Sequence, residues 1–236
     1  MMNVAVVLAG GMGIRAGLEI PKQYYEVNGK PVIAYCLHTF LMHEKIDAVQ
    51  IVADRVWHGY IMQHLFVLPC NEKFRGFSVP GENRQLSVYH ALIDIRKYAS
   101  DDDFVIVHDA ARPCVSAVQI TDCLKMAKGH DGILPVLPMK DNVYLSKDGK
   151  KVSSLLNRGM VFAGQAPEVF MLYRYYEANR ALLPDKILEI NGSAEPAVMA
   201  GMDIAMISGD ERNFKITTAA DLERFRKTLQ KDGCTA

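Results

Sequence analysis

The stretch VVLAGGMGIRAGLEIPKQY, residues 6–24, joins an apolar run to a glycine-rich loop that carries Arg15 and ends in Pro21, Lys22 and Gln23. The apolar run predicts a buried strand, and the glycines let the backbone that follows pass close to a ligand. Two cations beside such a loop indicate that the ligand is an anion. A loop of this kind after a strand is typical of α/β proteins, which bind ligands at the carboxyl ends of their strands.

The rest of the chain alternates short apolar runs rich in Val and Ile with stretches of helical length. Strands are predicted at 4–9, 48–53, 103–109, 132–137 and 203–209, and helices at 31–44, 83–99, 117–129, 168–183 and 218–231. Continuous apolar strands that alternate with helices are typical of a mainly parallel sheet covered on both faces. We therefore expect an α/β fold, a Rossmann-like three-layer sandwich with a mainly parallel mixed sheet, in one domain that spans residues 1–236.

Residues 141–157, DNVYLSKDGKKVSSLLN, differ in composition from the apolar strands, because two short polar runs flank Asp148 and Gly149. An Asp-Gly pair between such runs predicts a β-hairpin. The hairpin has few apolar residues with which to bury itself, so we expect a β-arm at about 139–160 that protrudes from the domain and packs on a partner. A hairpin that is simply solvated is the alternative.

The charges balance, with 27 basic and 27 acidic residues, so no overall field draws the protein to nucleic acid or to an anionic membrane. Any phosphate site must therefore be local. The five cysteines are scattered without a Cys-x-x-Cys pair, which argues against a disulfide framework or a zinc site and fits a reducing cytoplasm. The first residues read as a strand rather than as a signal peptide or membrane helix, which predicts a soluble protein.

The glycine loop does not match the common nucleotide fingerprints. A dinucleotide site needs an acidic residue after the second strand, where Asp54 is only the nearest candidate, and the Walker pattern is absent. What remains is a loop whose amides can cradle phosphates, with Arg15 and Lys22 on two sides of the anion. Such cations stabilise the charge that builds up when a phosphoryl bond breaks.

Five motifs along nearly the whole chain resemble those of one enzyme family. They are LAGGMGIR (8–15), PKQY (21–24), GENRQLSV (81–88), HDAARPCV (108–115) and NFKITTAADL (213–222). These motifs are similar to those of the cytidylyltransferases that join CTP to a polyol phosphate, which include the methylerythritol-phosphate and ribitol-phosphate enzymes. The resemblance implies a fold of the nucleotide-diphospho-sugar transferase type, a homodimer that swaps arms, and a place in the synthesis of isoprenoids or of wall and capsule polymers.

The resemblance also implies roles for particular residues. The nucleotide would be held by the glycine loop and the GENR motif, that is by Ala9, Gly10, Gly11, Gly13, Gly81, Glu82, Arg84 and Ser87. The charge of the transition state would be carried by Arg15, Lys22 and Lys215. The acceptor would contact Asp109, Arg112, Asn142 and Arg158, the last of them across a dimer. Mg²⁺ or another divalent cation would accompany the triphosphate, with Asp109 as its protein ligand.

The residues themselves support a role for Asp109 and leave alternatives open. Asp109 follows the apolar run FVIV, so its carboxylate emerges at a strand end beside the glycine loop, where magnesium on a triphosphate needs oxygen ligands. An aspartate that caps a helix or a turn is the alternative. Arg112 either binds a substrate or clamps its own loop. His108 is expected to be a packed histidine, because an ionised phosphate acceptor needs no base and catalysis is then positioning and electrostatics.

The chain departs from the family pattern at positions that the resemblance assigns to the acceptor side. The methylerythritol-phosphate enzymes carry Thr-Pro-Gln where this chain has Ala166-Pro167-Glu168, and a threonine where it has Asn142. They also carry Thr-Asp-Asp-Ala where the best register gives Asn191, Gly192, Ser193 and Ala194. A site built to bond particular hydroxyls rejects a substrate whose partners have changed. The acceptor therefore stays open between ribitol 5-phosphate, methylerythritol 4-phosphate and another sugar phosphate, and CTP is not separated from UTP.

The sequence predicts a CTP-dependent cytidylyltransferase that transfers CMP to a polyol phosphate and releases pyrophosphate. A protein that binds the nucleotide without catalysis is a rival, but binding alone would tolerate the loss of Arg15 and Lys22, and both are present. A nicotinamide-dependent oxidoreductase is a second rival, which the broken dinucleotide fingerprint disfavours.

Overall fold

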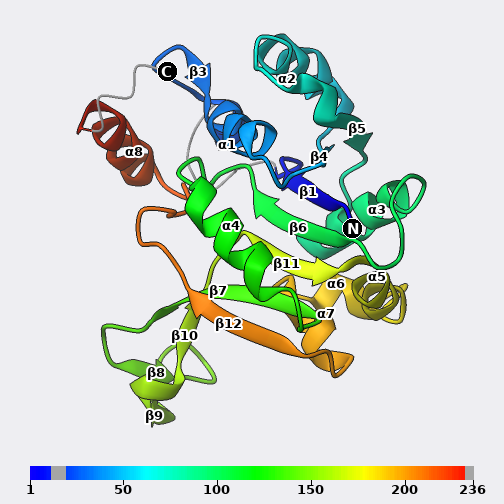
Figure 1. Ribbon diagram of the computed structural model, residues 1–236. Coiled ribbons are helices and arrows are strands. Elements are labelled where there is room, and N and C mark those ends of the chain that lie inside the picture. The colour runs from blue at the N-terminus through cyan, green and yellow to red at the C-terminus, as the bar shows by residue number, and fades with distance from the viewer. Residues whose placement is uncertain (12–19, 232–236) are drawn as a thin grey trace.

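A computed structural model describes residues 1–11 and 20–231, and Figure 1 shows how its elements are arranged. In this part of the chain eight strands form the central sheet, in the order β10-β7-β11-β6-β1-β4-β5, with β12 also paired to β7. They span Asn3–Leu8 (β1), Ala48–Val52 (β4), Phe74–Ser78 (β5), Phe104–Asp109 (β6), Gly132–Pro138 (β7), Phe162–Gly164 (β10), Glu168–Met171 (β11) and Ile204–Ser208 (β12). The predicted α/β fold with a mainly parallel mixed sheet is confirmed.

Helices cover both faces of the sheet, because successive residues of a strand point to opposite sides. Ala5 and Val7 of β1 belong to a core that includes residues of α1, α2 and α4, whereas Val4 and Val6 pack with α3, α5 and α7. In Figure 1, α4 crosses the front of the sheet. The helices span Val32–Met42 (α1), His58–Leu65 (α2), Arg84–Ile95 (α3), Ala117–Met126 (α4), Leu172–Arg180 (α5), Lys186–Glu189 (α6), Ala194–Met199 (α7) and Ala219–Lys231 (α8).

The sheet is parallel except where β10 and β11 run against it. β1 is parallel to both β4 and β6, whereas β11 lies antiparallel between β6 and β7. The helix expected over 168–183 therefore starts later than predicted, because residues 168–171 form β11 and α5 begins at Leu172. The backbone groups of this buried segment bond to β6 on one side and to β7 on the other. A helix at the same place would not form these bonds and would leave the two neighbouring strands unpaired there.

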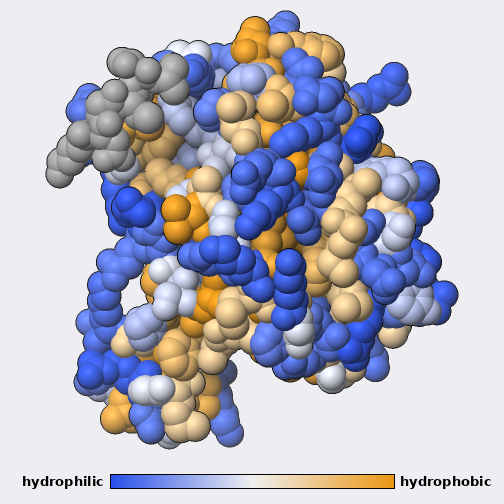
Figure 2. Space-filling view, in the orientation of Figure 1, coloured by the Kyte–Doolittle hydropathy of each residue, from blue (hydrophilic) through white to orange (hydrophobic). Residues whose placement is uncertain are grey.

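The hairpin expected at 141–157 forms from β8, Val143–Leu145, and β9, Ser154–Leu156. It interrupts the sheet between β7 and β10, whose residues Pro138 and Phe162 still face each other across the ladder. Figure 1 shows the arm projecting at the lower left, and Figure 2 shows apolar side chains gathered there. The exposed apolar residues of the arm and its base are Tyr144, Leu145, Val152, Leu155, Met160 and Phe162.

The C-terminal helix α8 fixes the segment that carries the NFKITT motif. Leu222 and Phe225 of α8 pack with Ile216 of that motif and with Val27 and Val32 near the start of the chain. Val27 belongs to a short ladder of β2, Glu26–Val27, and β3, Lys30–Pro31. This small core holds the last motif against the residues that follow the PKQY motif. Among the described residues, no helix is both long and apolar enough to cross a membrane.

Candidate active site

A cavity of about 800 Å³ opens at the carboxyl ends of four strands. Leu8 ends β1, Asp109 ends β6, Asp54 follows β4, and Pro80 follows β5. The cavity is lined by Leu8, Gly10, Gly11, Lys22, Gln23, Asp54, Pro80, Gly81, Glu82, Asn83, Arg84, Ser87, Asp109, Ala111, Lys215 and Thr217. Residues of all five motifs quoted from the sequence therefore meet at one place, where parallel strands usually bind ligands.

The glycine loop is held by the side chains of the PKQY motif. Gln23 donates from Nε2 to the carbonyl oxygens of Ala9 and Gly11, both at 2.7 Å, and the Tyr24 hydroxyl donates to Ala9 at 2.8 Å. Ala9 itself is buried, so its part is to anchor the loop rather than to line the cavity. Neither Gln23 nor Tyr24 is among the site residues predicted from the sequence. The predicted residues Gly13 and Arg15 lie outside the described residues.

The GENR motif turns the chain into helix α3 beside the glycine loop. Asn83 caps the helix by accepting a bond from the Leu86 backbone at 2.8 Å, and Ser87 accepts one from the Gly81 backbone at 2.9 Å. A Cβ atom on Gly81 would lie 2.6 Å from Leu86, so only glycine fits there. The start of α3 lines the cavity with Asn83, Arg84 and Ser87, and the positive end of the helix dipole there favours an anion.

The Asp109 carboxylate is the centre of a cluster of cations. Arg84 donates from Nε to Oδ1 at 3.0 Å, and Oδ2 lies 3.0 Å from Lys215 Nζ and 3.4 Å from Arg112 Nε. Burial by itself raises the pKa of Asp109. The three cations outweigh that effect and hold the pKa well below its usual range. Three cations around one carboxylate leave an excess of positive charge for a phosphate.

Lys215 reaches Asp109 because its loop is tied to the bend after β6. Asn213 is fully buried and donates from its side-chain Nδ2 to the Ala166 carbonyl at 2.6 Å, while its backbone carbonyl accepts from Arg112 Nη1 at 2.7 Å. The Ile216 backbone donates to Ala111 at 2.8 Å. Arg112 therefore fastens a distant loop, that of Asn213, where one reading of the sequence expected it to clamp its own, and it also contacts Asp109. The roles of Asn213 and Ala166 depend on contacts that no local pattern signals.

Glu168 and Ser193, two of the departures from the family pattern, lie beside Arg84. The Glu168 carboxylate is 3.7 Å from Arg84 Nη2, and Ser193 accepts a bond from Arg84 Nη1. Burial raises the pKa of Glu168 to about 7, although Arg84 acts in the opposite direction. These departures were assigned to the acceptor side, whereas Arg84 was assigned to the nucleotide. Residues predicted for the acceptor side therefore contact the guanidinium of Arg84, a residue predicted for the nucleotide side.

His108 is a packed residue, as expected. It is fully buried, its ring packs edge-on against Phe40, and Nε2 donates to the Arg112 carbonyl at 2.9 Å. Burial lowers the pKa of His108 to about 4, so the ring is neutral near pH 7. It does not line the cavity.

The donor set at Asp109 does not fit a resident metal ion. Among the residues that the structure describes, no three His, Cys, Asp or Glu side chains are grouped as ligands. Mg²⁺ prefers several oxygen ligands, and both oxygens of Asp109 already contact cations. A divalent ion that enters this site would have to bring its own oxygen ligands, such as those of a triphosphate.

Asn142 and Arg158, predicted to contact the acceptor, do not lie in this cavity. Both are exposed at the base of the arm, and Arg158 donates from Nη1 to the Lys140 carbonyl at 2.8 Å. Within one chain the structure therefore brings together the residues of the five motifs and leaves these two apart.

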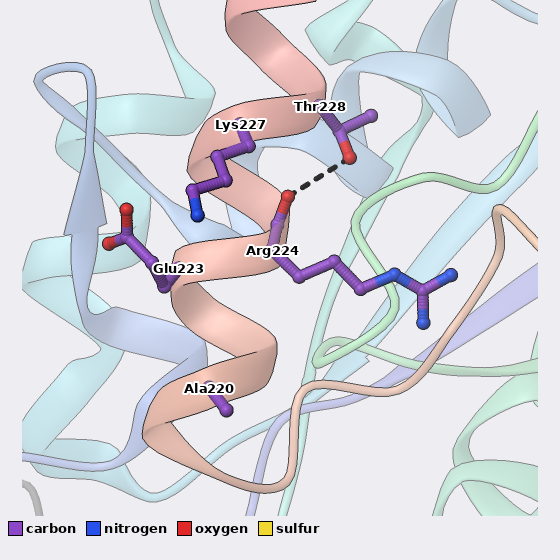
Figure 3. Close-up of a pocket in the computed structure, with 5 residues that line it drawn as sticks. All are labelled: Ala220, Glu223, Arg224, Lys227 and Thr228. Atoms are coloured by element: carbon purple, nitrogen blue, oxygen red, sulfur yellow. Dashed lines mark hydrogen bonds between the residues drawn. The ribbon is translucent and has the colours of Figure 1, made fainter.

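A second hollow lies along helix α8, and Figure 3 shows its lining. All of its residues come from that one helix, namely Ala220, Glu223, Arg224, Lys227 and Thr228. The one bond drawn among them joins the Thr228 hydroxyl to the Arg224 carbonyl and is local to the helix. An exposed helix face without a converging element does not make a site.

A family model and curated relatives match nearly the whole chain. The family model IspD, 2-C-methyl-D-erythritol 4-phosphate cytidylyltransferase, matches residues 3–231. A ribitol-5-phosphate cytidylyltransferase of Streptococcus agalactiae serotype V is 30% identical over 227 residues, which are 96% of this chain and 94% of that protein. One of Lacticaseibacillus paracasei is 28% identical, with 98% and 99% of the two chains covered.

Solved structures give the same picture at the level of the fold. The 2-C-methyl-D-erythritol 4-phosphate cytidylyltransferase of Francisella tularensis is 27% identical, with a TM-score of 0.80 over 97% of this chain and 100% of that one. The 4-diphosphocytidyl-2C-methyl-D-erythritol synthase of Anaerococcus prevotii has a TM-score of 0.79 at 22% identity over 97% and 96%. A family match that spans the sheet, the arm and every motif leaves one assignment: this chain belongs to the IspD family of cytidylyltransferases.

Proposed function

We propose that this chain transfers the cytidylyl group of CTP to ribitol 5-phosphate and releases pyrophosphate. Family membership makes the chain a nucleotidyltransferase that uses CTP and a polyol phosphate. The choice of acceptor rests on one observation: the similar proteins from Streptococcus agalactiae and Lacticaseibacillus paracasei, which match over nearly their whole length, are named ribitol-5-phosphate cytidylyltransferases. Such a product would feed wall or capsule polymers. The methylerythritol acceptor of the similar solved enzymes is the alternative, with a product for isoprenoids.

The cavity has the charges that this reaction needs. An oxygen of the acceptor phosphate attacks the α-phosphorus of CTP, the bond to the β-phosphate oxygen breaks, and pyrophosphate takes the electron pair. Lys22 and Lys215 line the cavity from two sides, where they would stabilise the developing negative charge. We assign the same role to Arg15, which lies outside the described residues. Because a phosphate monoester is largely ionised near pH 7, with a second pKa of about 6, no general base is required, which agrees with a buried and neutral His108.

We place the nucleotide between the glycine loop and the first turn of α3, against Gly10, Gly11, Gly81, Glu82 and Ser87. Amides of the loop and of the helix start would bind its phosphates and ribose. Because Asp109 is paired with cations, we treat a divalent ion such as Mg²⁺ as part of the substrate, bound to the triphosphate when CTP enters.

We also propose that the active unit is a homodimer in which each arm reaches the site of the other chain. The exposed apolar residues of the arm support a partner surface, and Asn142 and Arg158 lie at its base, away from the cavity of their own chain. An exchange of arms between the two chains would bring Asn142 and Arg158 to the acceptor in the partner's site.

The cysteine pattern supports a reducing compartment, and we propose a cytoplasmic location. The four cysteines in the described part of the chain, Cys36, Cys70, Cys114 and Cys123, form no disulfide with one another.

The decisive experiment is a pyrophosphate-release assay with CTP and Mg²⁺. Ribitol 5-phosphate and 2-C-methyl-D-erythritol 4-phosphate are supplied in parallel, with UTP in place of CTP as a nucleotide control and reactions without acceptor as blanks. Release with ribitol 5-phosphate, and at least about tenfold less with the other acceptor, is the expected result. A preference for methylerythritol phosphate would reverse the acceptor assignment. Protection of the protein against thermal unfolding by NADH but not by CTP would overturn the activity itself.

A further inference from the structure

Arg84 is held by three oxygen-bearing side chains from three different elements. It donates from Nε to Asp109 at the end of β6 and from Nη1 to Ser193, just before α7, and its Nη2 lies 3.7 Å from Glu168 at the start of β11. Glu168 and Ser193 are 8% and 1% exposed. The guanidinium therefore joins three elements. Its position at Asp109 depends on the charges of the side chains that contact its two Nη atoms, Glu168 and Ser193.

Glu168 and Ser193 approach one guanidinium from different elements. Glu168 brings a carboxylate to it, and Ser193 brings a hydroxyl. The two positions are far apart in sequence, yet their side chains contact the same guanidinium. A carboxylate at either position would therefore be placed against Arg84.

We propose that Glu168 is a positioning residue for Arg84, and that Ser193 is a second position from which a side chain acts on the same guanidinium, so that the pair together sets the position of Arg84 against Asp109. This inference rests on the proposed function and adds to it the residues that hold its cation cluster. Neither residue lines the cavity, so each acts through Arg84.

The charge balance around Arg84 couples positions 168 and 193. Arg84, Arg112 and Lys215 face Asp109 and Glu168, which leaves one excess positive charge when both carboxyls are ionised. An aspartate at 193 beside Glu168 would place a third carboxylate on a buried guanidinium and remove that excess. A glutamine at 168 beside Ser193 would leave Arg84 paired with Asp109 alone. Either single change alters the charge that Arg84 meets opposite Asp109, and with it the position of the guanidinium, whereas moving the carboxylate from 168 to 193 keeps that charge.

The segment at 193 is fixed well enough for such an exchange to be local. The Tyr175 hydroxyl donates to the Ser193 carbonyl at 2.8 Å and accepts from Gln85 Nε2 at 3.0 Å. Tyr175 and Gln85 are both buried. A new side chain at 193 would therefore start from the same backbone position and face the same guanidinium.

The test is a double-mutant cycle with Glu168→Gln, Ser193→Asp and the double variant. For each form we measure kcat and KM for the acceptor that the wild type uses, the Kd for CTP by calorimetry, and the melting temperature. Glu177→Gln is the matched control, because Glu177 is a carboxylate that pairs with an arginine, Arg180, on the surface of α5. Each single variant is expected to lose about tenfold or more in kcat/KM, and the double variant to recover to within about threefold of the wild type.

The outcomes separate this inference from the proposed function. Losses that add up or deepen in the double variant, in forms that melt as single folded species, would overturn the pairing, as would a Glu168→Gln enzyme with unchanged kinetics. A wild type without turnover on any acceptor would remove the proposed acceptor only. In that case the Kd for CTP tests the pairing, since Arg84 lines the cavity. Weaker CTP binding by both single variants, with binding like the wild type by the double variant, would support the pairing. Equal Kd values for all four forms would reject it.

Discussion

At the scale of single residues, Lys22 carries the most direct prediction. It lines the cavity next to the glycine loop and precedes Gln23, which holds that loop. Lys22→Ala is expected to lower kcat by about 10²- to 10³-fold, because a lysine that neutralises the reacting phosphates acts mainly in the transition state. The KM for CTP should change much less. Steady-state pyrophosphate release measures both.

The control for that variant is Lys97→Ala, which removes a surface lysine paired with Asp94 on α3. Its kinetics should match the wild type. A Lys22→Ala enzyme that kept full turnover would refute the catalytic role of this lysine.

Glu168 carries a prediction about pH. The pKa of a free glutamate is near 4.5, and burial raises that of Glu168 to about 7, so between these values the folded protein holds a proton that the unfolded chain has lost. The free energy of unfolding therefore falls as pH rises from about 4.5 to about 7 and then levels off. Glu168→Gln removes this fall, by an amount of up to about 3 kcal/mol. Urea unfolding at pH 5 and pH 8 measures it.

The expected result is a variant that gains stability relative to the wild type at pH 8 and gains little at pH 5. An equal difference at the two pH values would show that Glu168 does not titrate on folding. If Glu168 serves function at a cost in stability, Glu168→Gln should gain stability and lose activity.

The residues of the site differ in how clearly the sequence indicates them. Asp109 follows an apolar run, which marks it as the end of a buried strand, whereas Lys215 was predicted only through the resemblance of its motif to the family. The two side chains contact each other at 3.0 Å. Gln23 has no such mark, because its role is to bond two carbonyls that the fold brings to it. Glu168 was noted only as a departure, since its partner Arg84 lies on another element.

At the scale of elements, the turn into α3 carries the next prediction. Gly81→Ala would place a Cβ 2.6 Å from Leu86, at the start of the helix that faces the cavity. The helix start must shift, at a cost of about 1–3 kcal/mol in stability and with weaker CTP binding. Thermal melting and calorimetry measure the two effects.

Gly59→Ala is the matched control, because Gly59 lies in helix α2 and a Cβ there meets no atom within 4 Å. Alanine in a helix should leave stability unchanged or raise it by up to about 1 kcal/mol. Equal melting temperatures for Gly81→Ala and the wild type would contradict the close packing.

The elements that the sequence predicted well are those with long apolar runs, such as β1 and β6, whose burial on both faces leaves a plain signal. β11 was missed because its run Glu168–Met171 continues into α5 without a break. β5 was missed for another reason. As an edge strand it is only half-buried and contains Arg75 and Gly76, which weaken an apolar pattern.

At the scale of the whole molecule, the arm predicts the state of assembly. Leu155 lies on β9 with 60% of its surface exposed, and a charge there would be buried in the proposed dimer. Leu155→Glu is expected to convert a dimer to monomers in sedimentation-velocity experiments. Turnover with the acceptor should fall, while the Kd for CTP stays the same, because Asn142 and Arg158 would no longer reach a partner site.

Val67→Glu is the control, since Val67 is 79% exposed beyond the end of α2 and away from the arm. It should remain a dimer. A monomeric wild type, or a dimer that Leu155→Glu does not disturb, would contradict the assembly through the arm.

The arm is inserted between two residues that already face each other. Pro138 and Phe162 are partners in the ladder of β7 and β10, so the excursion between them starts and ends at one point of the sheet. Residues paired across an antiparallel ladder are only about 5 Å apart, and a tight turn can join them. The arm is therefore modular, because its length can change without a change in the sheet. The cavity is the opposite case, since it is built from segments that are distant in sequence and a shift in any one of them disturbs the others.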